Sequence, residues 1–208
     1  MSDEIPPTRW ERLIGPQSRY AEVFEDLIAR GEDIDGEARL VDALAPRHAR
    51  VLDAGAGVGR VAAALALRGH DVTAVEKDRD LIARSRRLFP DVPVVETDIL
   101  GLSPAFLDEQ GRPSSYDVIV VVGNVMVYLA EGTETRALRT LHDLLAPEGR
   151  MLVGFNPEKG PPHSRDYPRA DFRAHAAAAG LTVEHEFRSY DLRPAGGDYV
   201  VAVLCRDG

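Results

Sequence analysis

The chain has 208 residues, which fits one domain at a typical ~150 residues per domain and is long enough to bury a core without disulfides. Hydrophobic residues make up 44% and charged residues 28%, an ordinary globular composition that excludes disorder over the whole chain. The net charge of −9 argues against a nucleic-acid partner, because such proteins present basic faces. The single cysteine, Cys205, excludes an internal disulfide and a multi-cysteine metal site.

The first ten residues, Met1 to Trp10, are polar and contain prolines. They lack the charged and then apolar layout of a secretory signal, and no apolar run approaches the ~20 residues of a membrane span, so we expect a cytoplasmic protein. Apolar residues then recur at helical spacing from Tyr20 to Ile28, and Gly31 ends that pattern. A second short helix is expected over 36–45, with Asp35 as its cap.

From residue 50 onward, short apolar runs alternate with helical patterns. We expect strands at 50–54, 71–75, 93–96, 116–122, 150–155, 182–190 and 198–205. We expect helices at 59–68, 79–89, 133–145 and 171–179, with a polar loop at 101–115 that can hold one helical turn. This alternation predicts a parallel sheet covered by helices. The last two strands are joined by a turn too short to cross over, so they should be antiparallel.

A glycine-rich turn follows the first expected strand. Gly55 and Gly57 lie between Asp53 and a helix that begins near Gly59. Glycines here permit tight backbone angles and let a ligand approach the main chain, and the free N–H groups of the next helix favour an anionic group. Glycine spacing alone is a weak signal, so a turn without a ligand stays open. A dinucleotide fingerprint would need Gly or Ala where this chain has Arg60, which disfavours a nicotinamide-dependent oxidoreductase.

Acidic residues also end the next two expected strands. Glu76 ends the second strand, where a carboxylate can accept hydrogen bonds from two ribose hydroxyls; a solvated strand end is the alternative. Asp98 follows the third strand and is suited to accept a hydrogen bond from an adenine amino group, with Ile99 against the ring. Alone, Asp98 would be a loop aspartate, but with Asp53 and Glu76 it is the third member of an ordered set.

From residue 50 onward, the sequence resembles the class I S-adenosylmethionine-dependent methyltransferases. The resemblance is carried by Asp53, the three glycines of the turn, Glu76, Asp98 and Ile99, and by the runs 116–124 and 144–152. It implies an α/β fold: a Rossmann-like, seven-stranded, mostly parallel sheet of order 3-2-1-4-5-7-6, with strand 7 antiparallel and helices on both faces. It also implies a single domain, with an N-terminal helical lid over 1–48 and a cofactor-binding core over 49–208.

The resemblance further implies that the cofactor is S-adenosylmethionine and that one product is S-adenosylhomocysteine. The expected cofactor-binding residues are Tyr20, Arg39, Asp53, Ala54, Gly55, Gly57, Gly59, Glu76, Lys77, Asp98, Ile99, Gly123 and Asn124. Arg39 is suited to pair with the cofactor carboxylate, but a surface arginine on a helix explains it equally well. Tyr20 belongs either to the lid core or to the cofactor contacts.

Methyl transfer from a sulfonium displaces an already activated group, so the protein must mainly align the acceptor and exclude water. No fixed catalytic residue is required; His163, in the proline-rich loop 156–168, is the candidate base, with a solvated loop histidine as the alternative. Tyr128 either lines the pocket or packs in the core. The Gly123-Asn124 sequence differs from the motif of amino-directed DNA methyltransferases. It also contains no pair of acidic residues that could hold a divalent metal ion.

We therefore expect a small-molecule methyltransferase that does not bind membranes. The alternatives are an RNA or protein methyltransferase and a non-catalytic domain that binds S-adenosylmethionine. The sequence leaves open the acceptor, the atom that is methylated, and whether the protein is a monomer or a homodimer.

Overall fold

The computed structural model describes residues 5–13 and 19–207. Parts of the predicted lid, at 1–4 and 14–18, lie outside the described residues. The strands are β1 (Arg50–Ala54), β2 (Asp71–Glu76), β3 (Val94–Glu96), β4 (Tyr116–Val121), β5 (Leu145–Phe155), β6 (Leu181–Phe187) and β7 (Val200–Arg206). The helices are α1 (Arg9–Leu13), α2 (Tyr20–Ala29), α3 (Gly36–Leu44), α4 (Arg60–Leu67), α5 (Arg79–Leu88), α6 (Pro104–Glu109), α7 (Val125–Tyr128), α8 (Glu134–Leu144) and α9 (Arg169–Ala178), with a 3-10 turn at Ile99–Gly101.

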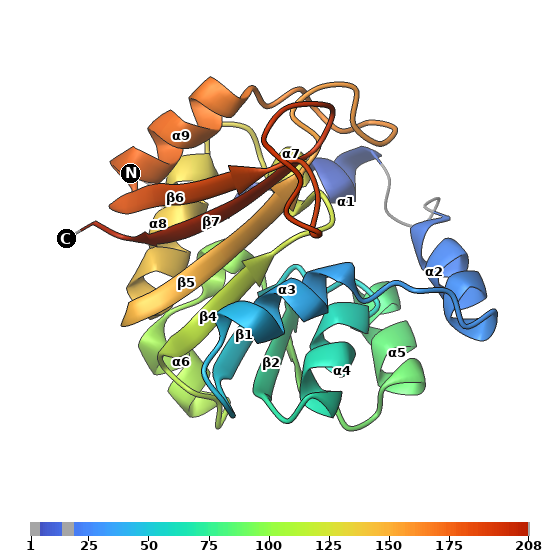
Figure 1. Cartoon of the computed structure of the whole chain (residues 1–208). Coiled ribbons are helices and arrows are strands. Elements are labelled where there is room, and N and C mark those ends of the chain that lie inside the picture. The colour runs from blue at the N-terminus through green and yellow to red at the C-terminus, as the bar shows by residue number, and fades with distance from the viewer. Residues whose placement is uncertain (1–4, 14–18, 208) are drawn as a thin grey trace.

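The seven strands form one sheet of order β3-β2-β1-β4-β5-β7-β6 (Figure 1). β1 pairs in parallel with β2 and β4, and the parallel pairing continues from β2 to β3 and from β4 to β5. β7 is antiparallel to both β5 and β6. The predicted sheet order and the antiparallel strand are therefore confirmed.

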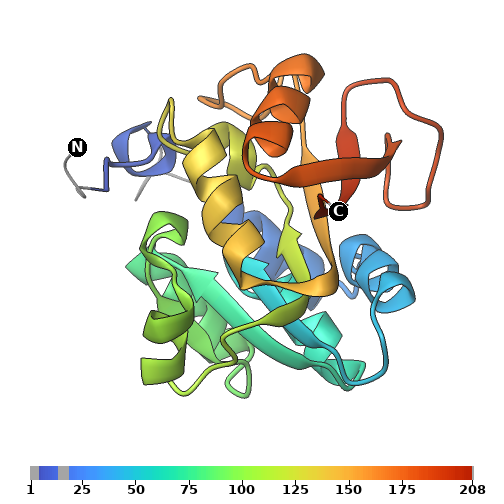
Figure 2. The same ribbon diagram turned by 90° about the vertical axis from the view of Figure 1, so that its left-hand side faces the viewer.

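Helices cover both faces of the sheet (Figures 1 and 2). The alternation of side chains along β4 shows why: Val118 and Val120 pack into the cluster with α3 and α4, whereas Ile119 and Val121 pack into the cluster with α8 and α9. A strand that is buried on both faces must be apolar at successive positions, as this one is. The two cores hold the sheet so that the carboxyl ends of the parallel strands stay free to form a site.

Local sequence explains several helix starts. Asp78 caps α5, because its carboxylate accepts hydrogen bonds from the N–H groups of Asp80 (2.9 Å) and Leu81 (3.3 Å). Ser103 caps α6 in the same way, and Pro104 occupies the first helical position, where its missing N–H costs nothing. Asp35 is the N-cap residue of α3, as predicted, but its side chain makes no cap hydrogen bond and instead pairs with Arg68 at 3.3 Å.

The structure also differs from the predicted boundaries. α1 and α7 were not expected, because each is too short to show helical periodicity. β5 begins at Leu145 rather than 150, and a register shift in its pairing with β4 accommodates the extra residues. Within the range 1–48 that is predicted as a lid, α3 buries Ala38 and Val41 in the core beside α4. Among the described residues, no helix is long and apolar enough to cross a bilayer.

Candidate active site

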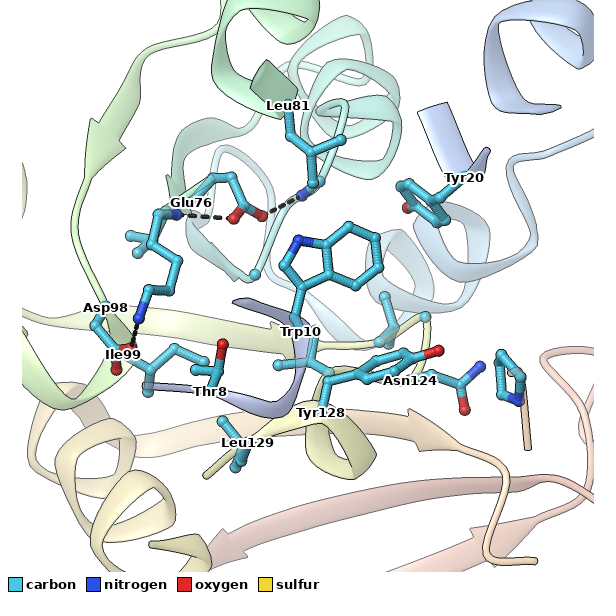
Figure 3. A pocket seen from close by; sticks show the side chains of 18 of the residues that line it. Thr8, Trp10, Tyr20, Glu76, Leu81, Asp98, Ile99, Asn124, Tyr128 and Leu129 are labelled. Atoms are coloured by element: carbon cyan, nitrogen blue, oxygen red, sulfur yellow. Dashed lines mark hydrogen bonds and ion pairs between the residues drawn. The ribbon is translucent and has the colours of Figure 1, made fainter. Parts of the chain in front are cut away.

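A cavity of about 650 Å³ lies at the carboxyl ends of the parallel strands, beneath α1 and α2 (Figure 3). That volume falls within the ~300–1,000 Å³ usual for small-molecule sites. The turns that follow β1, β2, β3 and β4 all contribute lining residues. The sequence therefore predicted the right edge of the sheet.

The glycine-rich turn after β1 lines one wall of the cavity through Gly55 and Gly57. Their φ angles are +82° and +59°, in the left-handed region that favours glycine. A Cβ atom on Gly55 would lie 2.6 Å from Cγ2 of Val125, and one on Gly57 would lie 2.9 Å from the Tyr20 hydroxyl. Gly59, also left-handed at +81°, ends the turn as the N-cap of α4 and does not line the cavity.

Asp53 and Ala54 lie behind this turn rather than in the cavity. Asp53 is 2% exposed, and its carboxylate accepts a hydrogen bond from the N–H of Ala62 at 3.2 Å. Burial raises the pKa of Asp53 to about 7. These two residues, predicted as cofactor contacts, do not line the cavity, and the Asp53 side chain is instead bonded to α4.

Glu76 lies at the end of β2 and faces the cavity. Its Oε2 accepts a hydrogen bond from the N–H of Gly57 at 2.9 Å, and its Oε1 accepts from Lys77 (2.8 Å) and Asp78 (2.9 Å). Burial raises the pKa of Glu76 despite these three backbone bonds. Oε2 makes one of those bonds and so retains acceptor capacity for a hydroxyl of a ligand.

Asp98 lies beyond β3, with Ile99 beside it in the lining. One carboxylate oxygen accepts a hydrogen bond from the N–H of Leu100 at 2.8 Å, and the other pairs with Nζ of Lys77 at 2.6 Å. Lys77 also pairs with Glu11 of α1 at 2.7 Å. Burial works against the Lys77 charge, but the two carboxylates outweigh it, so the pKa of Lys77 is raised.

The N-terminal helices close the cavity with aromatic rings. Trp10 lies between Tyr20 and Tyr128 in Figure 3, edge to face with each at centroid distances of 6.0 and 5.6 Å. Its indole N–H donates to Asp78 at 2.7 Å. Tyr20 was predicted, and its burial raises its pKa to about 12. Trp10 was missed because it lies in a polar segment, although it is the only tryptophan of the chain.

Arg39, predicted to face the cofactor, does not line the cavity. It lies on the outer face of α3, where it pairs with Asp33 at 2.7 Å and its side chain is 54% exposed. The buried arginine is Arg60, which pairs with both carboxylate oxygens of Glu37 and donates to the carbonyl of Ile34 at 2.7 Å. Its guanidinium lies 4.7 Å from the ring centroid of Phe24, a lining residue of α2.

Gly123 and Asn124, both predicted, line the cavity after β4. Their φ angles are +70° and +77°, so the chain makes two left-handed steps in succession. The structure therefore brings nine of the predicted cofactor residues to one cavity. These residues are Tyr20, Gly55, Gly57, Glu76, Lys77, Asp98, Ile99, Gly123 and Asn124.

His163 also lines the cavity, as the sequence predicted, and the prolines before it do so too. Its carbonyl oxygen accepts a hydrogen bond from Nε of Arg9 at 2.6 Å, which ties this loop to α1. The Tyr128 hydroxyl donates to the carbonyl of Pro162 at 3.0 Å. Within 5–13 and 19–207, no group of His, Cys, Asp and Glu side chains is placed to hold a metal ion.

Comparison with known proteins identifies relatives of this chain. A family model described as a methyltransferase domain matches residues 52–151. A solved TehB-like SAM-dependent methyltransferase from Corynebacterium glutamicum is 37% identical, with 91% of this chain and 97% of that chain covered and a TM-score of 0.79. The 1,6-didemethyltoxoflavin-N1-methyltransferase of Burkholderia thailandensis, solved with bound 1,6-didemethyltoxoflavin and S-adenosylhomocysteine, shares the fold with a TM-score of 0.61. It is 23% identical, with 90% of this chain and 87% of that chain covered.

A curated relative is more distant. The putative methyltransferase YqeM of Bacillus subtilis is 22% identical over 134 residues, or 64% of this chain. The match covers 52% of the relative, so the chain spans about half the length of that protein. The similarity to the Corynebacterium structure extends over nearly the whole of both chains. The chain therefore belongs to the S-adenosylmethionine-dependent methyltransferases.

Proposed function

We propose that the protein transfers the methyl group of S-adenosylmethionine to a small-molecule acceptor held in this cavity. The observation that carries the proposal is the convergence of Glu76, Asp98 and the Gly55–Gly57 turn on one cavity that α1 and α2 cover. These residues follow three different strands. Together they supply two carboxylates that accept hydrogen bonds and a glycine backbone that a ligand can approach. A binding site for an adenosine derivative accounts for all of them together.

The donor set fits the cofactor. A carboxylate has about four lone-pair positions, so both Glu76 and Asp98 keep acceptor capacity beyond their bonds within the protein. We assign Glu76 to the ribose hydroxyls and Asp98, with Ile99, to the adenine. The backbone of Gly55 and Gly57 would lie beside the methionyl part. S-adenosylmethionine supplies a methyl group that its sulfonium has already activated.

The protein then has two tasks, alignment and exclusion of water. The rings of Trp10, Tyr20 and Tyr128 shield the cavity from solvent. The imidazole of His163 is the candidate base for an acceptor that arrives protonated, because histidine is the side chain most often used for proton transfer. An acceptor that arrives deprotonated would need no base.

The attachment of α1 supports a small acceptor. α1 is tied to one side of the cavity by Trp10 with Asp78 and by Glu11 with Lys77, and to the other side by Arg9 with the His163 carbonyl. An acceptor must therefore fit beneath α1, in the part of the 650 Å³ that the cofactor leaves. This arrangement favours a small molecule over a nucleotide within an RNA or a side chain within a protein.

Calorimetric titration with S-adenosylhomocysteine tests the cofactor assignment. Glu76→Gln should weaken binding by roughly tenfold to a hundredfold, the range for a hydrogen bond to a charged group. Glu96→Gln is the matched control: Glu96 is the register partner of Glu76 on β3, but it pairs with Arg79 on the surface and does not line the cavity. Equal affinities of both variants and the wild type would refute the role of Glu76.

Two further titrations address the function as a whole. NADH should not bind, and S-adenosylhomocysteine should bind the wild-type protein in the micromolar range. Production of S-adenosylhomocysteine from S-adenosylmethionine is then measured with small phenols, thiols and amines, with total RNA, and with a protein mixture. Turnover with RNA or protein alone would replace the small-molecule proposal, and wild-type protein that binds no S-adenosylhomocysteine would overturn the methyltransferase proposal.

A further inference from the structure

The turn at Gly123–Asn124 is a strained part of the cavity wall. Both residues have left-handed φ angles, and Asn124 is not a glycine, so its conformation costs free energy that the surroundings must offset. Both line the cavity, and α7 starts immediately after them. The position of this turn therefore depends on what holds it.

The end of β5 holds the turn on one side. The N–H of Asn124 donates to the carbonyl oxygen of Gly154 at 3.1 Å. The side-chain Oδ1 of Asn124 accepts from the N–H of Asn156 at 2.8 Å. The turn is thus attached to Gly154 and Asn156, and any shift of this strand end is passed to the cavity wall.

Two tyrosine hydroxyls lie against that strand end. Tyr190 and Tyr199 come from the connection between β6 and β7, and their hydroxyl oxygens are 2.9 Å apart. A Cβ atom on Gly154 would lie 2.9 Å from the Tyr199 hydroxyl and closer still to that of Tyr190. Only a glycine fits at position 154, because the two tyrosine hydroxyls occupy the space that a side chain would need.

Burial raises the pKa of Tyr199 to about 12, although its hydrogen bond with Tyr190 opposes that rise. Burial also raises the pKa of Tyr190 well above its usual value. Both phenols therefore stay protonated near neutral pH, so the pair is uncharged and can share one hydroxyl proton in a hydrogen bond.

The backbone that carries these phenols is itself fixed. Nη2 of Arg169 donates to the carbonyls of Gly197 (2.8 Å) and Tyr199 (3.2 Å). Nδ2 of Asn156 donates to the carbonyl of Asp198 at 2.7 Å. Tyr190 packs against α3, since a Cβ on Gly36 would lie 3.6 Å from its Cβ. The β6–β7 connection is therefore a rigid support for the turn.

We propose that Tyr199 is a positioning residue for methyl transfer, which holds the Gly123–Asn124 turn through the close approach of its hydroxyl to Gly154, the residue whose carbonyl accepts from Asn124, with Tyr190 orienting that hydroxyl. This inference rests on the proposed function, because the turn borders the cofactor assigned above. It gives a role at the site to two residues that do not line the cavity.

The test compares Tyr199→Phe and Tyr190→Phe with Tyr167→Phe. Tyr167 is a matched control: its buried hydroxyl bonds to Nδ1 of His175 at 2.8 Å, and it does not line the cavity. All three variants lose one hydroxyl from a packed interior. Each is measured for thermal unfolding, for affinity toward S-adenosylhomocysteine, and for the amide resonance of Gly123 in a nitrogen–proton correlation spectrum.

Tyr199→Phe should raise the dissociation constant of S-adenosylhomocysteine about fivefold, the effect of one neutral hydrogen bond, and should move the Gly123 amide resonance. Tyr190→Phe should move the same resonance less, and Tyr167→Phe should change neither readout. An unmoved Gly123 resonance together with unchanged affinity in Tyr199→Phe would overturn the inference. If the wild-type protein itself bound no S-adenosylhomocysteine, the proposed function would fail, while the Gly123 resonance would still decide whether Tyr199 holds the turn.

Discussion

Breaking the buried ion pair between Arg60 and Glu37 should destabilise the protein strongly. Their side chains are only 8% and 11% exposed, and the guanidinium contacts both carboxylate oxygens. Burial opposes the Arg60 charge, but hydrogen bonding to Glu37 outweighs it, so the pKa of Arg60 is raised. Glu37→Leu removes the partner and leaves a buried charge with the Ile34 carbonyl as its remaining acceptor among the described residues.

The expected cost is about 3–5 kcal/mol, the range measured when one partner of a buried pair is removed. For a chain of this length, about 2–4 °C of melting temperature is lost per kcal/mol, so the melting temperature should fall by about 6–20 °C. Urea unfolding followed by circular dichroism measures the free energy. The double variant Glu37→Leu with Arg60→Leu should recover most of the loss, because no charge is then left buried.

An exposed pair between Arg39 of α3 and Asp33, which precedes that helix, provides the control. Arg39 and Asp33 are 54% and 66% exposed, so Asp33→Asn should change the free energy of unfolding by less than about 1 kcal/mol. A loss of less than about 1 kcal/mol in Glu37→Leu would refute the reasoning, as would a double variant no more stable than the single one. Because Arg60 lies over Phe24, the single variant should also weaken S-adenosylhomocysteine binding.

Two further predictions concern the glycine-rich turn. Gly57→Ala should weaken S-adenosylhomocysteine binding about tenfold in calorimetry, because the new Cβ would displace the Tyr20 hydroxyl, which lies 2.9 Å away. Gly31→Ala is the control, since Gly31 is also left-handed but has no neighbour within 4 Å. Both variants should lose ~1–2 kcal/mol of stability from the left-handed backbone, but Gly31→Ala should leave binding unchanged. Burial raises the folded-state pKa of Asp53 to about 7, above the ~3.9 of an unfolded chain, so its contribution to stability is present at low pH and is lost as pH rises toward 7. The melting temperature of Asp53→Asn minus that of the wild type should therefore be higher at pH 8 than at pH 5. A difference that does not change with pH would contradict the raised pKa of Asp53.

The sequence by itself determined the order of strands and helices along the chain, and the family resemblance of its motifs implied the sheet order and the cofactor. These features depend on local signals. The continuous apolar run of β4 requires burial on both faces of the sheet. The left-handed φ angles of Gly55 and Gly57 favour glycine because of the local backbone conformation alone, independent of contacts with distant parts of the chain. Glu76 and Asp98 are placed by the strands they terminate, so strand prediction placed them too.

Only the tertiary structure decided which side chains surround that edge. Arg39 is exposed on α3 whereas Arg60 is buried on α4, because packing against distant segments decides which helix face meets the core. Trp10 lies in a five-residue helix that has no periodicity of its own and is held by contacts with Asp78, 68 residues away. Tyr199 lies against Gly154 only because β7 pairs with β5, and such pairing between distant strands leaves no signal in the residues near Tyr199 itself.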